Sequence, residues 1–176
     1  MDVLRNVLNI GAEIDIRSVE ELYLDDEDSF NDMNYSLIGN DIDYYHCPLP
    51  INDFLLSHSV YAEIFHRIVF ALRSNKTIYL HCAGGADRTG AVMMMLETVL
   101  GVEESDIAKD FELTSFAPAY YDNNNFRFCY RCKTVLDYFD SCGDEGTTRN
   151  ERIESFLKKN GVTSSEISDF KRLMLK

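Results

Sequence analysis

The 176-residue chain is poor in positive charge and has no long apolar run. It carries 17 Lys and Arg residues against 30 Asp and Glu residues, so its formal net charge at pH 7 is −13. This excess of acid disfavours nucleic acids and anionic membranes as partners, because both carry negative charge themselves. No stretch is apolar over the roughly 18 residues that a membrane span requires, and the N-terminus lacks the charged-then-apolar pattern of a signal peptide. We therefore expect neither a membrane span nor a nucleic-acid partner.

Paired cysteines are also missing. The chain has five cysteines, an odd number, and their spacing is not that of a small disulfide framework. Cys129 and Cys132 have the spacing of a redox motif or of half a zinc site, but no second pair with that spacing follows. We therefore expect no metal and no cofactor, and we expect a reducing compartment, the cytoplasm, as the location. Under oxidation, Cys47 or Cys142 could form a disulfide with Cys82.

Internal repeats and low-complexity segments are absent as well. The hydrophobic fraction of 45% and the aromatic fraction of 12% are typical of a folded soluble protein. A chain of this length can bury a full core, so we expect one domain over residues 1–176. Nothing in the sequence indicates an oligomeric state.

The most informative stretch is the ten residues from His81 to Gly90. It follows Thr77–Leu80, a β-branched and apolar segment that predicts a buried strand. It precedes Ala91–Leu96, which has no Gly or Pro and predicts a buried helix. A glycine-containing loop that leads from a strand into a helix points several backbone N–H groups at one place, at the positive end of the helix dipole. The stretch is therefore a predicted anion site, with phosphate as the usual ligand.

Cys82 and Arg88 would make this anion site reactive. A thiol beside a helix N-terminus and an arginine has a lowered pKa, so Cys82 would be largely thiolate at neutral pH. Arg88 offers a planar, permanently charged group that matches two phosphoryl oxygens. Together they predict attack of the sulfur on a phosphate monoester and a phosphocysteine intermediate. The alternative is a buried structural cysteine beside an ordinary turn.

The stretch resembles the His-Cys-x5-Arg-Ser/Thr-Gly signature of the cysteine-dependent protein tyrosine phosphatase superfamily. Asp87 before the arginine, and the segment 112–116, resemble its bacterial tyrosine and dual-specificity branch. The resemblance implies a phosphatase in which Cys82 attacks, Arg88 holds the phosphoryl group and Thr89 stabilises the departing thiolate. The residues that would surround the phosphoryl group are Ala83, Gly84, Gly85, Ala86, Asp87 and Arg88.

A positioned acid must supply the proton that the leaving oxygen takes up. Asp53 precedes Cys82 by one helix and one strand, and the resemblance implies that dual-specificity members carry a general acid on a loop at about this place. Asp87, inside the loop itself, is a second candidate, because the resemblance implies this role for the Asp before the Arg in some bacterial relatives. Asp41 and Asp43 are further candidates. For Asp53 the structural alternative is a favourable charge at the start of the next helix.

Other polar and aromatic residues are assigned smaller roles. The resemblance implies that His81 orients the Cys82 backbone and tunes the thiolate, although a buried structural histidine fits the sequence equally. Tyr120 and Tyr121 could line the pocket. The acidic block at residues 20–28 is expected to be a solvated loop.

The rest of the chain predicts an α/β fold. Strand candidates alternate with a long helix that is expected over residues 59–72, an order that favours a mostly parallel sheet. The predicted strands are residues 13–16, 35–38, 44–47 and 77–80. We expect a central sheet of about four to five strands flanked by helices, a structural role for Arg17 after the first strand, and a helical C-terminal half. Two late helices are expected to begin at capping boxes, Thr148-x-x-Glu151 and Thr163-x-x-Glu166.

The predicted function is hydrolysis of a phosphate monoester through Cys82, with phosphotyrosine on a protein as the first substrate class. Inositol phosphates or phosphoinositides are the second class, although relatives that cleave phosphoinositides often carry Lys where this chain has Ala86. A phosphate-binding module without turnover is a third possibility. A sulfur transferase of the rhodanese type is disfavoured by the ending Arg88-Thr89-Gly90. The expected partners are thus a phosphorylated protein or a small phosphate monoester.

Overall fold

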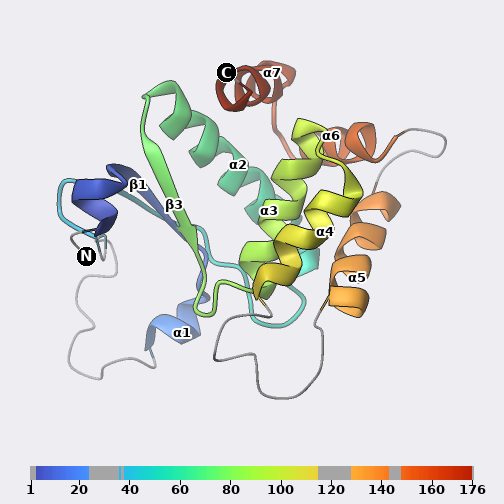
Figure 1. The fold of residues 1–176 in the computed structure, drawn as a ribbon, viewed down its shortest axis with the longest axis horizontal. Coiled ribbons are helices and arrows are strands. Elements are labelled where there is room, and N and C mark those ends of the chain that lie inside the picture. The colour runs from blue at the N-terminus through green and yellow to red at the C-terminus, as the bar shows by residue number, and fades with distance from the viewer. Residues whose placement is uncertain (1–2, 24–35, 37, 115–127, 143–147, 176) are drawn as a thin grey trace.

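The computed structural model describes residues 3–23, 36, 38–114, 128–142 and 148–175. Within these residues the centre is a three-stranded parallel sheet in the order β2-β1-β3. The strands are β1 (Ile10–Asp15), β2 (Asp43–His46) and β3 (Thr77–His81). All three run in the same direction, so their carboxyl ends meet at one edge of the sheet, and the loop that contains Cys82 begins there (Figure 1).

The two faces of the sheet differ in polarity, because side chains alternate between faces along each strand. Ile14 of β1 lies on an apolar face together with Tyr45, Ile78 and Leu80. Helix α2 (His58–Arg73) packs on this face and contributes to the same buried cluster. The opposite face carries polar side chains, which are those of Glu13, Asp15, Tyr44, His46, Tyr79 and His81.

Helices supply most of the remaining core residues. Helix α3 (Asp87–Leu100) starts beyond the loop that follows β3, and it contacts helices α4 to α7. These are α4 (Glu104–Leu113), α5 (Phe128–Ser141), α6 (Arg149–Lys159) and α7 (Ser164–Met174). A short helix, α1 (Val19–Tyr23), lies at the same end of the sheet as the Cys82 loop, and helical turns cover Val3–Val7 and Phe54–Leu56.

Local signals in the sequence explain where several helices begin and end. Gly101 ends α3 in the left-handed conformation with φ 78°, which glycine adopts at no steric cost. Thr148 and Glu151 form a capping box before α6, and Thr163 and Glu166 form another before α7. Both predicted capping boxes are therefore confirmed.

The predicted architecture is confirmed as an α/β fold with a parallel sheet flanked by helices. The predicted number of strands is too high, because the sheet has three strands in the described residues. Ser36 and Ile38 fall in a predicted strand, but neither is part of one. The Ser36 hydroxyl instead accepts the N–H groups of Ile38 at 3.0 Å and Gly39 at 3.4 Å, local bonds that compete with strand pairing. The other two residues of that segment lie outside the described part of the chain.

Glu97 on α3 carries a carboxyl group that is unfavourable to ionise in the folded protein. Burial, together with the nearby charge of Asp110, raises its pKa to about 7. The unfolded chain releases this proton near the ordinary value of 4.5, so the folded state binds more protons between pH 4.5 and 7 and loses stability as the pH rises. Glu97→Gln should remove this loss and increase the free energy of unfolding at pH 8 by about 1 kcal/mol, since the carboxyl remains partly solvated. Urea unfolding of both proteins at pH 5 and pH 8 measures the effect, and an equal gain at both values would contradict it.

Candidate active site

The loop of residues 82–86 joins the end of β3 to the start of α3 and folds around the Cys82 thiol. The N–H of Gly85 donates to Cys82 Sγ at 3.2 Å. The Thr89 hydroxyl accepts the N–H of Cys82 at 3.0 Å, which ties the two ends of the loop together. Gly85 has φ 64°, a left-handed conformation that most residues with a side chain adopt only at a cost. The strand–loop–helix geometry that the sequence predicts is therefore confirmed.

The surroundings of Cys82 favour its thiolate form. The residue is 7% exposed, and burial alone would raise its pKa. The hydroxyl and N–H of Thr89 and the N–H groups of Gly84 and Gly85 outweigh burial, so the pKa of Cys82 is lowered. The positive end of α3 acts in the same sense, because Asp87 is already the first residue of that helix. The sulfur is therefore a better nucleophile near neutral pH than an ordinary cysteine.

Arg88 is buried and is held by two acceptors. Its Nη1 and Nη2 atoms both donate to the carboxylate of Glu21, the second at 2.5 Å, and Nη1 also donates to the carbonyl of Leu49 at 3.1 Å. These bonds use both hydrogens of Nη1 and the hydrogen of Nη2 that points away from Nε. The Nε–H and the other hydrogen of Nη2, which lies on the Nε side, have no acceptor among the described residues. They form a parallel fork that matches two oxygens of a phosphoryl group.

Glu21 is a site residue that the sequence analysis missed. Its acidic block was expected to be solvated, and this expectation is wrong for Glu21, whose side chain is only 13% exposed. Glu21 lies in α1, and its carboxylate also accepts the N–H of Ser18 at 2.7 Å. The spacing Ser18-x-x-Glu21 is that of a capping box, which was a signal in the sequence for a helix start. Only the tertiary fold brings this helix to Arg88, 67 residues further along the chain.

A pocket of about 600 Å³ opens beside Arg88. Its walls include the aromatic side chains of Phe54 and Phe111. Both predicted general acids, Asp53 and Asp87, line the same pocket. The structure thus brings the arginine and the two candidate acids together around one space.

Gly90 allows the Phe111 ring to reach this position. A Cβ atom on Gly90 would lie 2.6 Å from Cε2 of Phe111, a distance that would force the ring to move. Helices α3 and α4 therefore approach closely where the signature stretch ends. Packing gives a physical reason for glycine at this position of the stretch.

The structure does not bring Asp41 and Asp43 to this pocket. Asp43 is the first residue of β2, whereas Cys82 follows the last residue of β3, which places them about 13 Å apart along the strand direction. Asp41 instead pairs with Arg5 at 2.6 Å, and Asp43 pairs with Lys76 at 2.5 Å.

Cys47 and Cys82 lie on opposite sides of β1. The N–H of Cys47 donates to the carbonyl of Asp15, and the N–H of Ile16 donates to the carbonyl of His81. Two strand spacings therefore separate the cysteines, roughly 9.6 Å, whereas a disulfide needs Cα atoms within about 7 Å. The disulfide suggested between them would require the backbone to move.

A family model described as the tyrosine phosphatase family matches residues 1–176. The chain belongs to the tyrosine phosphatase family. No curated protein matches it. The match over the whole chain confirms the resemblance to this family and supports phosphatase activity in general.

Several predictions for this tyrosine phosphatase family member lie away from the loop. Arg17 donates from Nε and Nη2 to the Asp15 carboxylate, the latter at 2.6 Å, which is consistent with its predicted structural role. Tyr120, Tyr121 and the side chain of Cys129 lie outside the described residues. The residues that are described include no group of three or more His, Cys, Asp or Glu side chains placed to hold a metal. Their helices include none that is long and apolar enough to cross a membrane.

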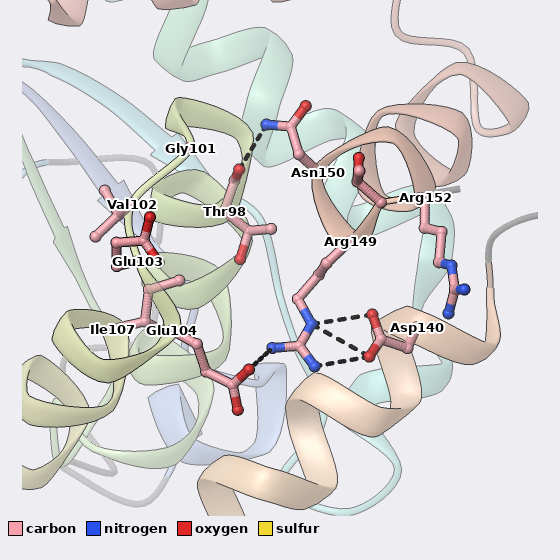
Figure 2. Close-up of a pocket in the computed structure, with 11 residues that line it drawn as sticks. Thr98, Gly101, Val102, Glu103, Glu104, Ile107, Asp140, Arg149, Asn150 and Arg152 are labelled. Carbon is pink, nitrogen blue, oxygen red and sulfur yellow. Dashed lines mark hydrogen bonds and ion pairs between the residues drawn. The ribbon is translucent and has the colours of Figure 1, made fainter. Parts of the chain in front are cut away.

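A second pocket, of about 740 Å³, lies at the other end of α3 (Figure 2). Because α3 has 14 residues, this pocket is roughly 20 Å from the loop of residues 82–86. The Arg149 guanidinium extends between Glu104 and Asp140, to which it donates at 2.8 Å and 2.7 Å. Arg149 on α6 thus pairs with one carboxylate on α4 and one on α5 and holds these helices together at the pocket.

Proposed function

We propose that the chain hydrolyses phosphate monoesters through a phosphocysteine intermediate on Cys82. The observation that carries this proposal is a cysteine with a lowered pKa inside a loop of N–H groups, close enough to the Arg88 guanidinium for their charges to interact. Membership of the tyrosine phosphatase family supports phosphatase activity in general. The site adds a nucleophile and a ligand for the phosphoryl group.

In the first step, the sulfur of Cys82 donates an electron pair to phosphorus, and an S–P bond forms as the P–O bond to the leaving group breaks. The fork of Arg88 binds two phosphoryl oxygens, and the N–H groups of the loop stabilise the charge on the phosphoryl group. The leaving oxygen takes a proton from Asp53 or Asp87, both of which line the pocket beside Arg88.

In the second step, the same carboxylate removes a proton from a water molecule. The water oxygen attacks phosphorus, and the S–P bond breaks. Cys82 leaves as a thiolate that Thr89 stabilises. The products are an alcohol or phenol and inorganic phosphate, and water is the co-reactant.

The pocket favours a substrate that carries one phosphate on an aromatic or apolar group. Arg88 is the cation among its described lining residues, whereas Asp53 and Asp87 are acids. A second phosphate on an inositol ring would lie near these carboxylates and be repelled. Phe54 and Phe111 offer apolar walls against which a phenyl ring can pack. Phosphotyrosine in a protein, or a small aryl phosphate, is therefore preferred over inositol phosphates and phosphoinositides.

Hydrolysis of p-nitrophenyl phosphate by the purified protein tests the proposal. We expect phosphate release that vanadate inhibits competitively, and a phosphorylated cysteine that can be trapped by rapid acid quenching. Hydrolysis without vanadate inhibition and without trapped phosphocysteine would contradict the mechanism. Binding of phosphotyrosine peptides without any phosphate release would indicate a binding module instead. A comparison of kcat/KM for phosphotyrosine peptides and inositol phosphates then tests the substrate class.

Glu21→Gln is expected to lower kcat/KM for p-nitrophenyl phosphate by about 10- to 100-fold. The variant keeps the shape of the side chain, but an NH2 group replaces one of the two carboxylate oxygens that accept from Arg88. The phosphate-binding fork of Arg88 is therefore less well oriented. Glu20→Gln is the matched control, because it removes the same charge from an exposed position of the same helix. Equal losses in both variants would assign the effect to net charge and not to the orientation of Arg88.

A further inference from the structure

A buried carboxylate lies directly behind the nucleophile and takes no part in the steps above. Glu13 on β1 is 0% exposed, and its Oε1 atom lies 2.9 Å from Nε2 of His81 at the end of β3. The other ring nitrogen of His81, Nδ1, lies 3.2 Å from the backbone carbonyl of Cys82. One imidazole ring therefore bridges a buried acid and the peptide group of the nucleophile.

Both partners of the His81 ring are hydrogen-bond acceptors. An ionised carboxylate and a carbonyl oxygen have no hydrogen to donate, so with Glu13 ionised each ring nitrogen must carry a proton for both contacts to be hydrogen bonds. The ring that fits this site is therefore the imidazolium, with Glu13 as its counter-ion. The pKa of His81 agrees with this assignment: burial acts to lower it, but Glu13, Asp15 and the Cys82 carbonyl outweigh burial and raise it.

The polar face of the sheet holds the Glu13–His81 pair in a fixed geometry. The hydroxyl of Ser36 donates to Oε2 of Glu13, so both carboxylate oxygens are engaged. The ring of Tyr79 stacks on the His81 ring, with centroids 4.8 Å apart and an interplanar angle of 21°. The carboxylate and the imidazole thus have little freedom to separate.

The other titratable groups on this face are engaged elsewhere. Asp15 lies opposite His81 in the sheet and pairs with Arg17 at 2.6 Å, and it also accepts the hydroxyl of Tyr44 at 3.1 Å. His46 on β2 contacts the backbone carbonyl of Arg17 at 2.9 Å. Helix α2 packs on the opposite face, so its charged residues do not face the ring. In the described part of the chain, the ring of His81 thus has one carboxylate in direct contact.

We propose that Glu13 is a positioning residue for Cys82 and that it acts through His81. This inference rests on the proposed function, because it makes Glu13 a support for the nucleophile of that reaction. Glu13 fixes the orientation and the positive charge of the ring, and this charge beside Cys82 favours the thiolate. The ring also holds the Cys82 carbonyl, so that this oxygen cannot turn into the anion site and repel the phosphoryl group.

The charge on His81 can be measured in the unaltered protein. Nitrogen chemical shifts of labelled histidine report whether each ring nitrogen carries a proton, and the spectrum of His81→Gln assigns the signal among the four histidines of the chain. We expect both nitrogens of His81 to be protonated at pH 6.5, where an ordinary histidine is about half charged. A ring with one bare nitrogen at this pH would overturn the proposal.

Glu13→Gln keeps the shape of the side chain and removes its charge. We expect it to raise the pKa of Cys82 by about one unit, measured from the pH dependence of alkylation by iodoacetamide, and to shift the acidic limb of kcat/KM in parallel. Ser36→Ala is the matched control, because it removes the other hydrogen bond of Glu13 at the same buried place but keeps the charge. It should leave the pKa of Cys82 within about 0.3 units. In a His81→Gln background, Glu13→Gln should add little, since the ring through which it acts is gone.

A folded Glu13→Gln protein with an unchanged alkylation profile would overturn the proposal, and so would an equal shift in Ser36→Ala. Thermal unfolding shows which variants are folded. If Glu13→Gln does not fold, the histidine spectrum of the unaltered protein decides alone. The histidine spectrum and the alkylation profile need no turnover. A failure of the proposed phosphatase function would therefore be seen separately, as the absence of phosphate release from the unaltered protein.

Discussion

Cys82→Ser is expected to lower kcat/KM for p-nitrophenyl phosphate by about 10⁴-fold or more, because a serine hydroxyl stays protonated near neutral pH. The N–H groups of Gly84, Gly85 and Thr89 lower the pKa of a thiol, which already ionises near neutrality. The same groups cannot bring a hydroxyl, which ionises at far higher pH, into that range. Steady-state hydrolysis by both proteins at one pH measures the loss.

Cys82→Ala separates binding from chemistry in the same site. Arg88 and the loop N–H groups remain in this variant, so we expect it to bind a phosphotyrosine peptide within about tenfold of the unaltered affinity while turnover is lost. Isothermal calorimetry measures the binding, and thermal unfolding shows that both variants are folded. Turnover by folded Cys82→Ser at the rate of the unaltered protein would remove Cys82 from the mechanism.

The reactive loop could be predicted from sequence because its parts are neighbours in the chain. The strand before Cys82, the glycine-containing loop and the apolar helix after it each have their own local signal. A parallel sheet then places the loop at the carboxyl end of a strand, where ligand sites of such sheets lie. The partner of Arg88 had no such signal. Glu21 is 67 residues away in a short helix, and no periodicity links the two positions.

The polar face of the sheet shows a second limit of sequence analysis. The alternation of residues 13–16 predicts a strand with one apolar face, and acids on the other face are usually in contact with water. In the structure Glu13 and Asp15 are both 0% exposed. Each has a basic side chain as its partner, Glu13 that of His81 and Asp15 that of Arg17, because an unpaired charge would be too costly to bury. These pairs, unlike the strand itself, depend on how strands and loops meet in the fold.

Asp53→Asn is expected to slow the hydrolysis of alkyl phosphates by about 10²- to 10³-fold and to affect p-nitrophenyl phosphate much less. A poor leaving group needs a proton as its bond to phosphorus breaks, whereas p-nitrophenolate leaves readily without one. The geometry favours Asp53 as the donor. It precedes the Phe54–Leu56 turn with φ 58°, yet its side chain makes no capping hydrogen bond to that turn. Its exposed carboxyl lines the pocket beside Arg88, so the role of a helix cap does not explain it.

Asp87→Asn tests the other candidate for the general acid. A series of substrates whose leaving groups differ in pKa distinguishes Asp53 from Asp87. Asp87 begins α3, where its charge stabilises the helix, so its loss should lower the unfolding temperature in addition to any effect on rate. The variant that lacks the general acid should show a steep dependence of kcat/KM on leaving-group pKa. It should also lose the basic limb of the pH profile, because that limb reports deprotonation of the acid. If the dependence on leaving-group pKa is steep in Asp87→Asn and unchanged in Asp53→Asn, the proton donor is Asp87 in the first turn of α3 and not Asp53.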